Sequence, residues 1–347
     1  KSSIDSLIFQ AFENNISNIF IQVRSRGDAL YKSKIVKINN NIESNFDPLE
    51  YSLMLSELLN IKVHVWINTY LIWSSPSPPD DNSHIYYLES EWFEKKRNGI
   101  SDVDLINKKE MIGEGLYLSP NHPEVNKYIY KVVKELIENY PNIHGIHFDY
   151  IRFQNNNYGF NEVGVNLFKE KFKFDPNIII NNYNDIGLDK FEADSLYNLW
   201  NDYSCNNITN LLRSVKEYLI STNSDILVSA AVKPNPIEAK NRWHQDWIYW
   251  IKNDLLDFAI PMNYMSNNST FINNLRKINS KVEANKIIIG IPLYNQDENM
   301  IAKKIILSKY SGYSKICLFS YNSMNNNNIN LDLIKYEYLN NKYMIED

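Results

Sequence analysis

The sequence alternates short runs of β-branched and aromatic residues with longer stretches of helical periodicity. This alternation predicts repeated strand–helix units that assemble into a parallel β-sheet with helices outside it. The runs that we expect to form strands are residues 18–24, 62–68, 144–149, 226–233, 257–264, 286–292 and 315–321. These seven strands are one fewer than a closed (β/α)8 barrel contains.

An eighth strand has two candidates. The segment GLYLS at residues 115–119 is one, although SPNHPEV directly after it is typical of a turn and a helix start. The alternative, which we favour, is a strand upstream of Lys1, because the chain opens with the amphipathic stretch SSIDSLIFQAFENN, which leads into the 18–24 strand. We therefore predict an α/β fold, a (β/α)8 TIM barrel whose first strand would precede Lys1, as a single domain over residues 1–347.

Two long insertions interrupt the pattern, at about residues 71–120 and 154–187. The first begins with the proline-rich WSSPSPPDDNSH, and the second is rich in asparagine. Both follow the C-terminal end of a predicted strand, which is the face where barrel enzymes build their sites. Long loops at this face predict a cleft suited to an extended ligand.

Composition narrows the class of partner. The 36 Lys and Arg residues against 41 Asp and Glu give a net charge of −5, and the basic residues are scattered along the chain. This distribution argues against nucleic acid as the main partner. No run approaches the roughly 20 apolar residues of a membrane helix, so we expect no integral membrane segment. We expect an exported protein whose signal would have preceded Lys1 and been removed.

The strands are predicted to have one apolar face and one face that becomes polar toward the C-terminal end. Val63, Val65 and Ile67 form one apolar set, which is suited to packing under helices. The polar residues at or near the strand ends on the other face are Arg24, Asn68, Asp149, Lys233 and Asn263. Such a set predicts the floor of a pocket, whereas the alternative is that these groups satisfy one another, for instance Asp149 paired with Arg24 or Arg152.

Asp149 is the strongest catalytic candidate, because a carboxylate at a strand end is held on rigid backbone and points into the pocket. Cleavage of a glycosidic bond needs such a carboxyl and a second one across the scissile bond. His147 lies two residues earlier on the same face, where it would orient Asp149 or be a satisfied core histidine.

The second carboxylate is not evident, since no other predicted strand ends in an inward Asp or Glu. Asp28 lies just beyond Arg24, could fold back over the pocket, and ranks first among the loop candidates. The other candidates are Glu238, Asp246 and Asp297.

Other chemistries have less support. There is no HExxH or GxSxG motif, no glycine-rich loop follows the late strands, and His144 and His147 fall on opposite faces of one strand. We therefore expect neither a metal nor a cofactor. Trp243, Trp247 and Trp250 have helical spacing, which favours core packing over a sugar platform.

Several segments together resemble the glycosyl hydrolase-like family 10 of bacterial barrel proteins. The segments, in the order and at roughly the spacing of that family, are FIQVRSRGDALYKS, VHVWINTY, YLSPNHPEV, GIHFDYIRF, VSAAVKPNP, RWHQDWIYWI, LLDFAIPMNYM and CLFSYNS. The resemblance implies a TIM barrel that is usually exported and acts on carbohydrate, with some relatives associated with peptidoglycan glycan strands.

The resemblance also carries functional residues over to this chain. The family's strand-end acid falls on Asp149, and its other motif positions fall on Gln22, Arg24, Asp28, Trp66, Asn68, Asn263 and Tyr264. Two positions depart from the family pattern. Tyr150 stands where many relatives carry a second acid, and Ser204 stands where an Arg is frequent.

Two functions from different classes follow. The first is hydrolysis of O-glycosidic bonds in a polysaccharide or glycan strand, with Asp149 and Asp28 as catalytic carboxylates. The residues expected to bind the carbohydrate are Gln22, Arg24, Trp66, Asn68, His147, Arg152, Asn263, Tyr264 and Tyr321. The second is a carbohydrate-binding barrel without turnover, which the lack of a well-placed second acid favours. A lyase or deacetylase is a third alternative.

Overall fold

The computed structural model describes residues 1–108, 110, 113–181 and 187–341. The strands are β1 (Asn18–Arg24), β2 (Lys62–Asn68), β3 (Leu71–Trp73), β4 (Leu116–Tyr117), β5 (Gly145–Asp149), β6 (Leu227–Val232), β7 (Phe258–Pro261), β8 (Ile289–Pro292) and β9 (Ile316–Phe319). The longer helices are α1 (Ser2–Glu13), α2 (Pro48–Leu58), α5 (Pro123–Asn139), α6 (Glu162–Phe172), α8 (Lys190–Ser221), α11 (Asn268–Asn279), α12 (Glu298–Tyr310) and α14 (Leu331–Asn341). The shorter ones are α3 (Ile85–Leu88), α4 (Asp102–Asn107), α7 (Pro176–Asn181), α9 (Pro236–Trp243), α10 (Trp247–Lys252) and α13 (Tyr321–Asn326), with 3₁₀ turns at Ser90–Trp92 and Ala284–Lys286.

The seven predicted strands are confirmed, and they follow one another in chain order. β1, β2, β5, β6 and β7 form one parallel sheet, and β8 pairs in parallel with β9. Isolated bridges from Ala259 to Ile287 and from Met262 to Gly290 connect the β7 and β8 segments. The candidate strand at 115–119 is not part of this sheet, because β4 pairs antiparallel with β3 inside the first insertion.

The sheet curls toward closure. Trp66 on β2 and Phe319 on β9 have ring centroids 5.7 Å apart, although four strands lie between β2 and β9 in the strand order. Within the described residues no ladder joins β9 to β1. The fold is therefore α/β with a central parallel sheet, and closure by an eighth strand stays a prediction.

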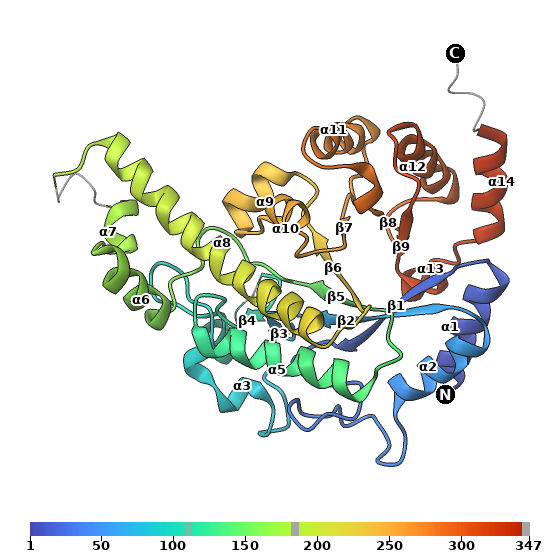
Figure 1. Ribbon diagram of the computed structural model, residues 1–347, viewed down its shortest axis with the longest axis horizontal. Helices are drawn as coiled ribbons and strands as arrows, with labels where there is room; N and C mark the ends of the chain where they lie inside the picture. The colour runs from blue at the N-terminus through green and yellow to red at the C-terminus, as the bar shows by residue number, and fades with distance from the viewer. Residues whose placement is uncertain (109, 111–112, 182–186, 342–347) are drawn as a thin grey trace.

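Helices cover the outside of the sheet (Figure 1). α5 and α8 pack against each other beside β5, α1 and α2 pack together near β1, and α12 packs against both α11 and α14. The N-terminal part of α8 extends beyond the sheet together with α6 and α7, as Figure 1 shows. No helix in the described ranges combines the length and apolar character needed to cross a bilayer.

Strand β2 and helix α5 illustrate how the sequence produces this packing. Val63, Val65 and Ile67 are at most 1% exposed and alternate along β2, so one face of the strand is apolar. α5 begins at Pro123 after a cap from His122, which accepts from the N–H of Glu124. The fully buried apolar residues on α5 are Val125, Ile129, Val132 and Leu136. Each contributes roughly 1.5–3 kcal/mol by leaving water.

Aromatic rings fill the N-terminal half of the sheet's inner face. Phe20 stacks on His64 at a centroid distance of 4.8 Å and meets His147 edge-on at 4.9 Å. Phe258 packs against His64 at 5.8 Å. These rings close the N-terminal end of the interior.

The prediction that Arg24 faces the interior is wrong. A bulge between Gln22 and Arg24 shifts the register, so Arg24 pairs with Ile67, whose side chain points outward. The guanidinium lies 5.9 Å from the ring of Tyr128 on α5 and donates to the carbonyl oxygen of Asn68. One extra residue in a strand reverses the face of the side chains that follow it.

The prediction that Asn263 faces the interior is also wrong. Its Nδ2 donates to the carbonyl oxygen of Phe271 at 3.0 Å, and its Oδ1 accepts from Asn274 at 2.9 Å. Both partners belong to α11 on the outside of the sheet. Phe258 is an inward residue of β7, so alternation places odd-numbered Asn263 on the opposite face.

Candidate active site

Asp149 is the last residue of β5, and its carboxyl is buried at the C-terminal end of the sheet. Its Oδ1 accepts from the N–H of Tyr150 at 2.7 Å, and Tyr150 has a φ of 51°, so the chain turns sharply there. The carbonyl oxygen of Asp149 accepts from the N–H of Thr69, which ties this turn to the end of β2. Asp149 is therefore held on rigid backbone, as the sequence predicted.

Burial raises the pKa of Asp149 to about 6, against the hydrogen bond from Tyr150 and the charge of Arg152, which lower it. A carboxyl with this pKa is half protonated near pH 6 and keeps its proton in roughly a tenth of the molecules at pH 7. It is therefore suited to donate a proton.

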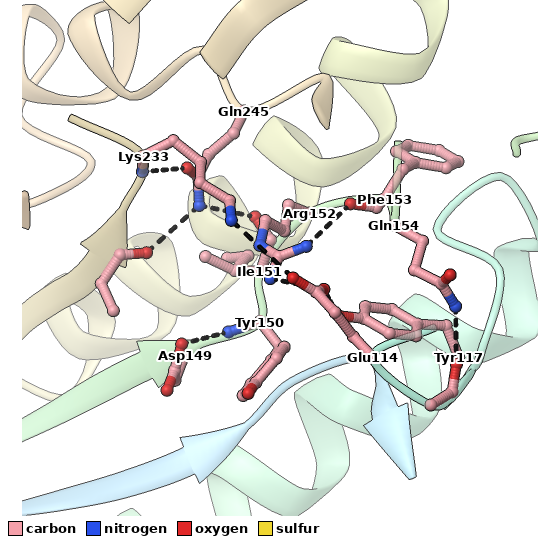
Figure 2. Close-up of polar contacts among 12 residues, drawn as sticks. Glu114, Tyr117, Asp149, Tyr150, Ile151, Arg152, Phe153, Gln154, Lys233 and Gln245 are labelled. Carbon is pink, nitrogen blue, oxygen red and sulfur yellow. Dashed lines mark hydrogen bonds and ion pairs between the residues drawn. The ribbon is translucent and has the colours of Figure 1, made fainter. Parts of the chain in front are cut away.

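A second carboxylate, Glu114, faces the same cluster from the first insertion (Figure 2). Its Oε2 lies 2.8 Å from Nη2 of Arg152 and accepts from the Tyr117 hydroxyl at 2.7 Å. Nζ of Lys233 lies 3.8 Å from Oε1 of Glu114. Because Arg152 is only 3% exposed whereas the Glu114 side chain is 42% exposed, the pair lies at the boundary between protein and solvent.

The pKa of Glu114 moves in the direction opposite to that of Asp149. Burial alone raises it, but Arg152, Tyr117 and Lys233 together outweigh burial, and the net shift is downward. Burial, together with the smaller effect of repulsion from Arg152, lowers the pKa of Lys233 to about 8. Two carboxyl groups whose pKa values are shifted in opposite directions are suited to divide the acid and base roles of a reaction between them.

Polar side chains from neighbouring strands adjoin Asp149. Asn68 pairs with Asp149 in the β2–β5 register, and its Oδ1 accepts from Gln22 at 3.1 Å. Trp66 lies in the next inward row, and its buried Nε1 has no hydrogen-bond partner among the described residues. Gln22, Trp66 and Asn68 therefore face inward as predicted.

Aromatic residues from the late strands complete this side. The Tyr264 ring stacks on Phe319 at 5.8 Å and an interplanar angle of 16°. The charge of Asp149 contributes to a raised pKa of Tyr264, after the larger effect of burial, so the two side chains adjoin. Tyr321 begins α13 and packs half-buried against the main core. The substrate contacts predicted for both tyrosines stay predictions.

His147 has the contacts of a core residue. Its Nδ1 lies 3.0 Å from the Ser229 hydroxyl, and its ring packs against Phe20. Burial lowers its pKa to about 3, so the imidazole is neutral. These contacts favour the second of the two sequence-based interpretations, a satisfied core histidine.

Asp28 lies in the loop after β1. It accepts from the N–H of Arg26 at 3.2 Å and from the amide of Asn39, so it organises that loop. Within the described ranges it makes none of the contacts that join Arg152, Glu114 and Lys233. Its catalytic role stays a prediction that this geometry does not favour.

The remaining loop carboxylates have structural partners. Glu238 pairs with Arg242 on the surface of α9, at 3.3 Å. Asp246 caps α10 by accepting from Tyr249, and Asp297 caps α12 by accepting from Met300. Of the tryptophan series, Trp247 and Trp250 are fully buried, and Trp243 is half-buried with its ring 4.6 Å from Nζ of Lys233.

Glu114 was not among the predicted site residues, because it lies neither at the end of a predicted strand nor in one of the loops considered for the second acid. Glu114 lies in the first insertion, two residues before β4, and reaches the site because this insertion folds back so that Glu114 meets Arg152 beyond the end of β5. The one local signal was a carboxylate between two glycines, Gly113 and Gly115, in an insertion that follows a strand.

Two surface cavities lie away from this cluster. One of about 430 Å³ lies between α1 and residues 324–332, and one of about 500 Å³ lies between α5 and α8. Among the described residues, no group of three His, Cys, Asp or Glu side chains is arranged to hold a metal ion.

The central parallel sheet with helices on its outer face places this chain in the structural class of the α/β proteins. Its fold resembles an alpha-L-fucosidase isoenzyme 2 from Paenibacillus thiaminolyticus, with a TM-score of 0.62 and 11% identity over 98% of this chain and 46% of that one. It also resembles a beta-galactosidase from the psychrophilic Marinomonas ef1, with a TM-score of 0.59 and 10% identity over 92% and 52% of the two chains.

The chain belongs to the family described as Glycosyl hydrolase-like 10, whose pattern matches residues 2–304. The resemblance that the sequence motifs indicated is thereby confirmed. Glycosyl hydrolase DigH of Escherichia coli strain K12 is 29% identical over 145 residues, which cover 39% of this chain and 30% of that relative. The match thus spans less than a third of the curated relative's length.

Proposed function

We propose that this protein hydrolyses O-glycosidic bonds, with Asp149 as the general acid and Glu114 as its carboxylate partner. The observation that carries the proposal is the pair of carboxyl groups with opposite pKa shifts beside the buried Arg152. Asp149 protonates the departing glycosidic oxygen, and ionised Glu114 acts from the other side as nucleophile or as base toward water.

The substrate class that we propose is a polysaccharide or glycan strand. Support comes from the two insertions at the catalytic end of the sheet, which suit an extended ligand. Trp66, Asn68 and Gln22 offer donors and acceptors for sugar hydroxyls. A peptidoglycan-type strand, and export of the protein, are further parts of this proposal that follow from the family resemblance.

One observation favours the second function, a carbohydrate-binding protein without turnover. Oε2 of Glu114 is already engaged by both Arg152 and Tyr117, and such engagement makes a carboxylate a weaker base. The less engaged Oε1, which faces Lys233 at 3.8 Å, is the oxygen left for chemistry.

The test is a glycan screen with product analysis on the wild type, Asp149→Asn, Glu114→Gln and Asp28→Asn. We expect both Asp149→Asn and Glu114→Gln to lose about 10²- to 10⁴-fold in kcat, since each removes one half of the acid–base pair. Asp28→Asn separates the two candidates for the second carboxylate. Activity retained in Glu114→Gln but lost in Asp28→Asn would restore Asp28 to that role. Glycan binding without hydrolysis by the wild type would support the binding protein instead.

A further inference from the structure

The backbone on either side of Glu114 carries no side chains of its own, because Gly113 and Gly115 flank it. Gly115 has a φ of 140°, and a Cβ there would lie 2.2 Å from the carbonyl oxygen of Trp73, so only glycine fits. A glycine-flanked residue gains little rigidity from its own segment. The position of Glu114 therefore depends on contacts from elsewhere in the molecule.

Gln154 supplies such a contact to the backbone. It is 7% exposed and lies two residues after Arg152, in the segment that follows β5. Its Nε2 donates to the carbonyl oxygen of Gly115 at 2.6 Å (Figure 2). A Cβ on Gly113 would lie 3.2 Å from Oε1 of Gln154, so the same amide adjoins both residues that flank Glu114.

The orientation of the Gln154 amide is fixed by a second acceptor. Nε2 also donates to Oδ2 of Asp102 at 2.6 Å, which uses both of its hydrogens. Asp102 is 2% exposed and accepts in addition from the Tyr158 hydroxyl at 2.8 Å. A flipped amide would direct its oxygen at a carboxylate and a carbonyl, so only one orientation satisfies both contacts.

We propose that Gln154 is a positioning residue that sets the Glu114 carboxylate against Arg152 and Asp149. This inference rests on the proposed function. The segment after β5 then holds both members of the pair, since Asp149 ends the strand, Arg152 binds the Glu114 carboxylate, and Gln154 binds the adjoining backbone.

The test compares Gln154→Met, which keeps the shape and removes both donated hydrogen bonds, with Tyr158→Phe. The second variant removes a hydroxyl from the same buried network without touching the residues that flank Glu114. We expect kcat of Gln154→Met to fall by about 10²-fold, because a misplacement of about 1 Å has that effect on a reacting group. KM should stay within about threefold, and Tyr158→Phe should stay near the wild type in both constants.

Two further readouts separate positioning from general stability. Glu114 loosened from Arg152 titrates at higher pH, so the acidic limb of kcat/KM should move upward in Gln154→Met and stay in place in Tyr158→Phe. Hydrogen exchange of peptides covering residues 113–118 should accelerate in Gln154→Met alone, and this measurement needs no turnover.

The outcomes distinguish the two proposals. If the wild type hydrolyses glycans and Gln154→Met keeps its kcat and acidic limb, the role of Gln154 is wrong and the function stands. Equal changes of kcat and of the acidic limb in Gln154→Met and Tyr158→Phe would also contradict a positioning role for Gln154. If the wild type hydrolyses no glycan, the proposed function fails. Faster exchange in Gln154→Met alone would then still support the claim that Gln154 holds the Glu114 segment, and unchanged exchange would refute it.

Discussion

At the scale of single residues, the site depends on how burial and charge divide two chemically similar groups. Asp149 is buried at a strand end, where desolvation raises its pKa. Glu114 is partly exposed, and two cations and a tyrosine hydroxyl lower its pKa. The pKa values of the two carboxyl groups are therefore shifted in opposite directions.

The first prediction concerns the pH dependence of the reaction. Because the pKa of Asp149 is about 6, kcat/KM should fall roughly tenfold for each pH unit above that value, as the acid loses its proton. The measurement is a pH profile between pH 4 and 9 on a natural glycosidic bond. An aryl glycoside, whose leaving group needs no protonation, is the control and should lack this alkaline limb. An identical limb with both substrates would contradict the assignment of Asp149 as acid.

At the scale of elements, the positions of the strands were predictable from the sequence. The side of the sheet on which the side chains at the strand ends lie was not. The seven strands appear in the sequence as short β-branched runs, and each was confirmed. A bulge before Arg24 leaves no clear mark in such a run, yet it reverses the face of that side chain. The prediction for Asn263 was wrong for a related reason. β7 ends at Pro261, and Asn263 beyond it hydrogen-bonds to α11.

The candidate site was predictable where a strand carries it. Asp149, Asn68 and Trp66 follow from alternation along β2 and β5. Glu114 was not, because its place depends on how an insertion folds onto the sheet, and that depends on long-range contacts such as those of Gln154.

The second prediction tests the outward placement of Arg24. Arg24→Met should destabilise the fold by about 1–3 kcal/mol, because the carbonyl oxygens of Asn68 and Thr69 lose a buried donor. KM should change by less than about twofold, since the side chain lies under α5. Urea denaturation and steady-state kinetics measure the two effects.

The comparison is the same substitution at the arginine that pairs with Glu114. Arg152→Met removes the cation beside Glu114 and should abolish hydrolysis. A large rise in KM for Arg24→Met with unchanged stability would show that Arg24 reaches the ligand after all.

At the scale of the whole molecule, a buried carboxyl joins the two insertions. Glu94 is 2% exposed, and its Oε1 accepts from the N–H of Gly159 at 3.0 Å and from the Ser119 hydroxyl at 3.4 Å. Ser119 belongs to the first insertion and Gly159 to the second. Burial raises the pKa of Glu94 to about 8, so the folded protein keeps it protonated near neutrality.

The third prediction follows from this linkage. The pKa of Glu94 in the folded state lies above 4.5, the usual value for a glutamate side chain, so the native state binds the proton more tightly than the unfolded chain does. Stability is therefore lost as pH rises from about 4.5 to about 8. Glu94→Gln cannot ionise, and it should match the wild type near pH 4 and exceed it by a few kcal/mol at pH 8.

Denaturant unfolding across that pH range measures the effect. Glu91→Gln, at an exposed position in the same insertion, is the control and should keep the wild-type slope. Parallel curves for Glu94→Gln and the wild type would mean that Glu94 is ionised in the native fold.

The two halves of the proposed catalytic pair have different origins, one at the end of a strand of the sheet and one in the first insertion, just before β4. A descendant of this protein that shortened this insertion would keep the inward side chains of Gln22, Trp66 and Asn68 in place. Under the proposed function, such a descendant would still bind carbohydrate and would no longer cleave it. Hydrolase and lectin would then be separated in evolution by the length of one loop.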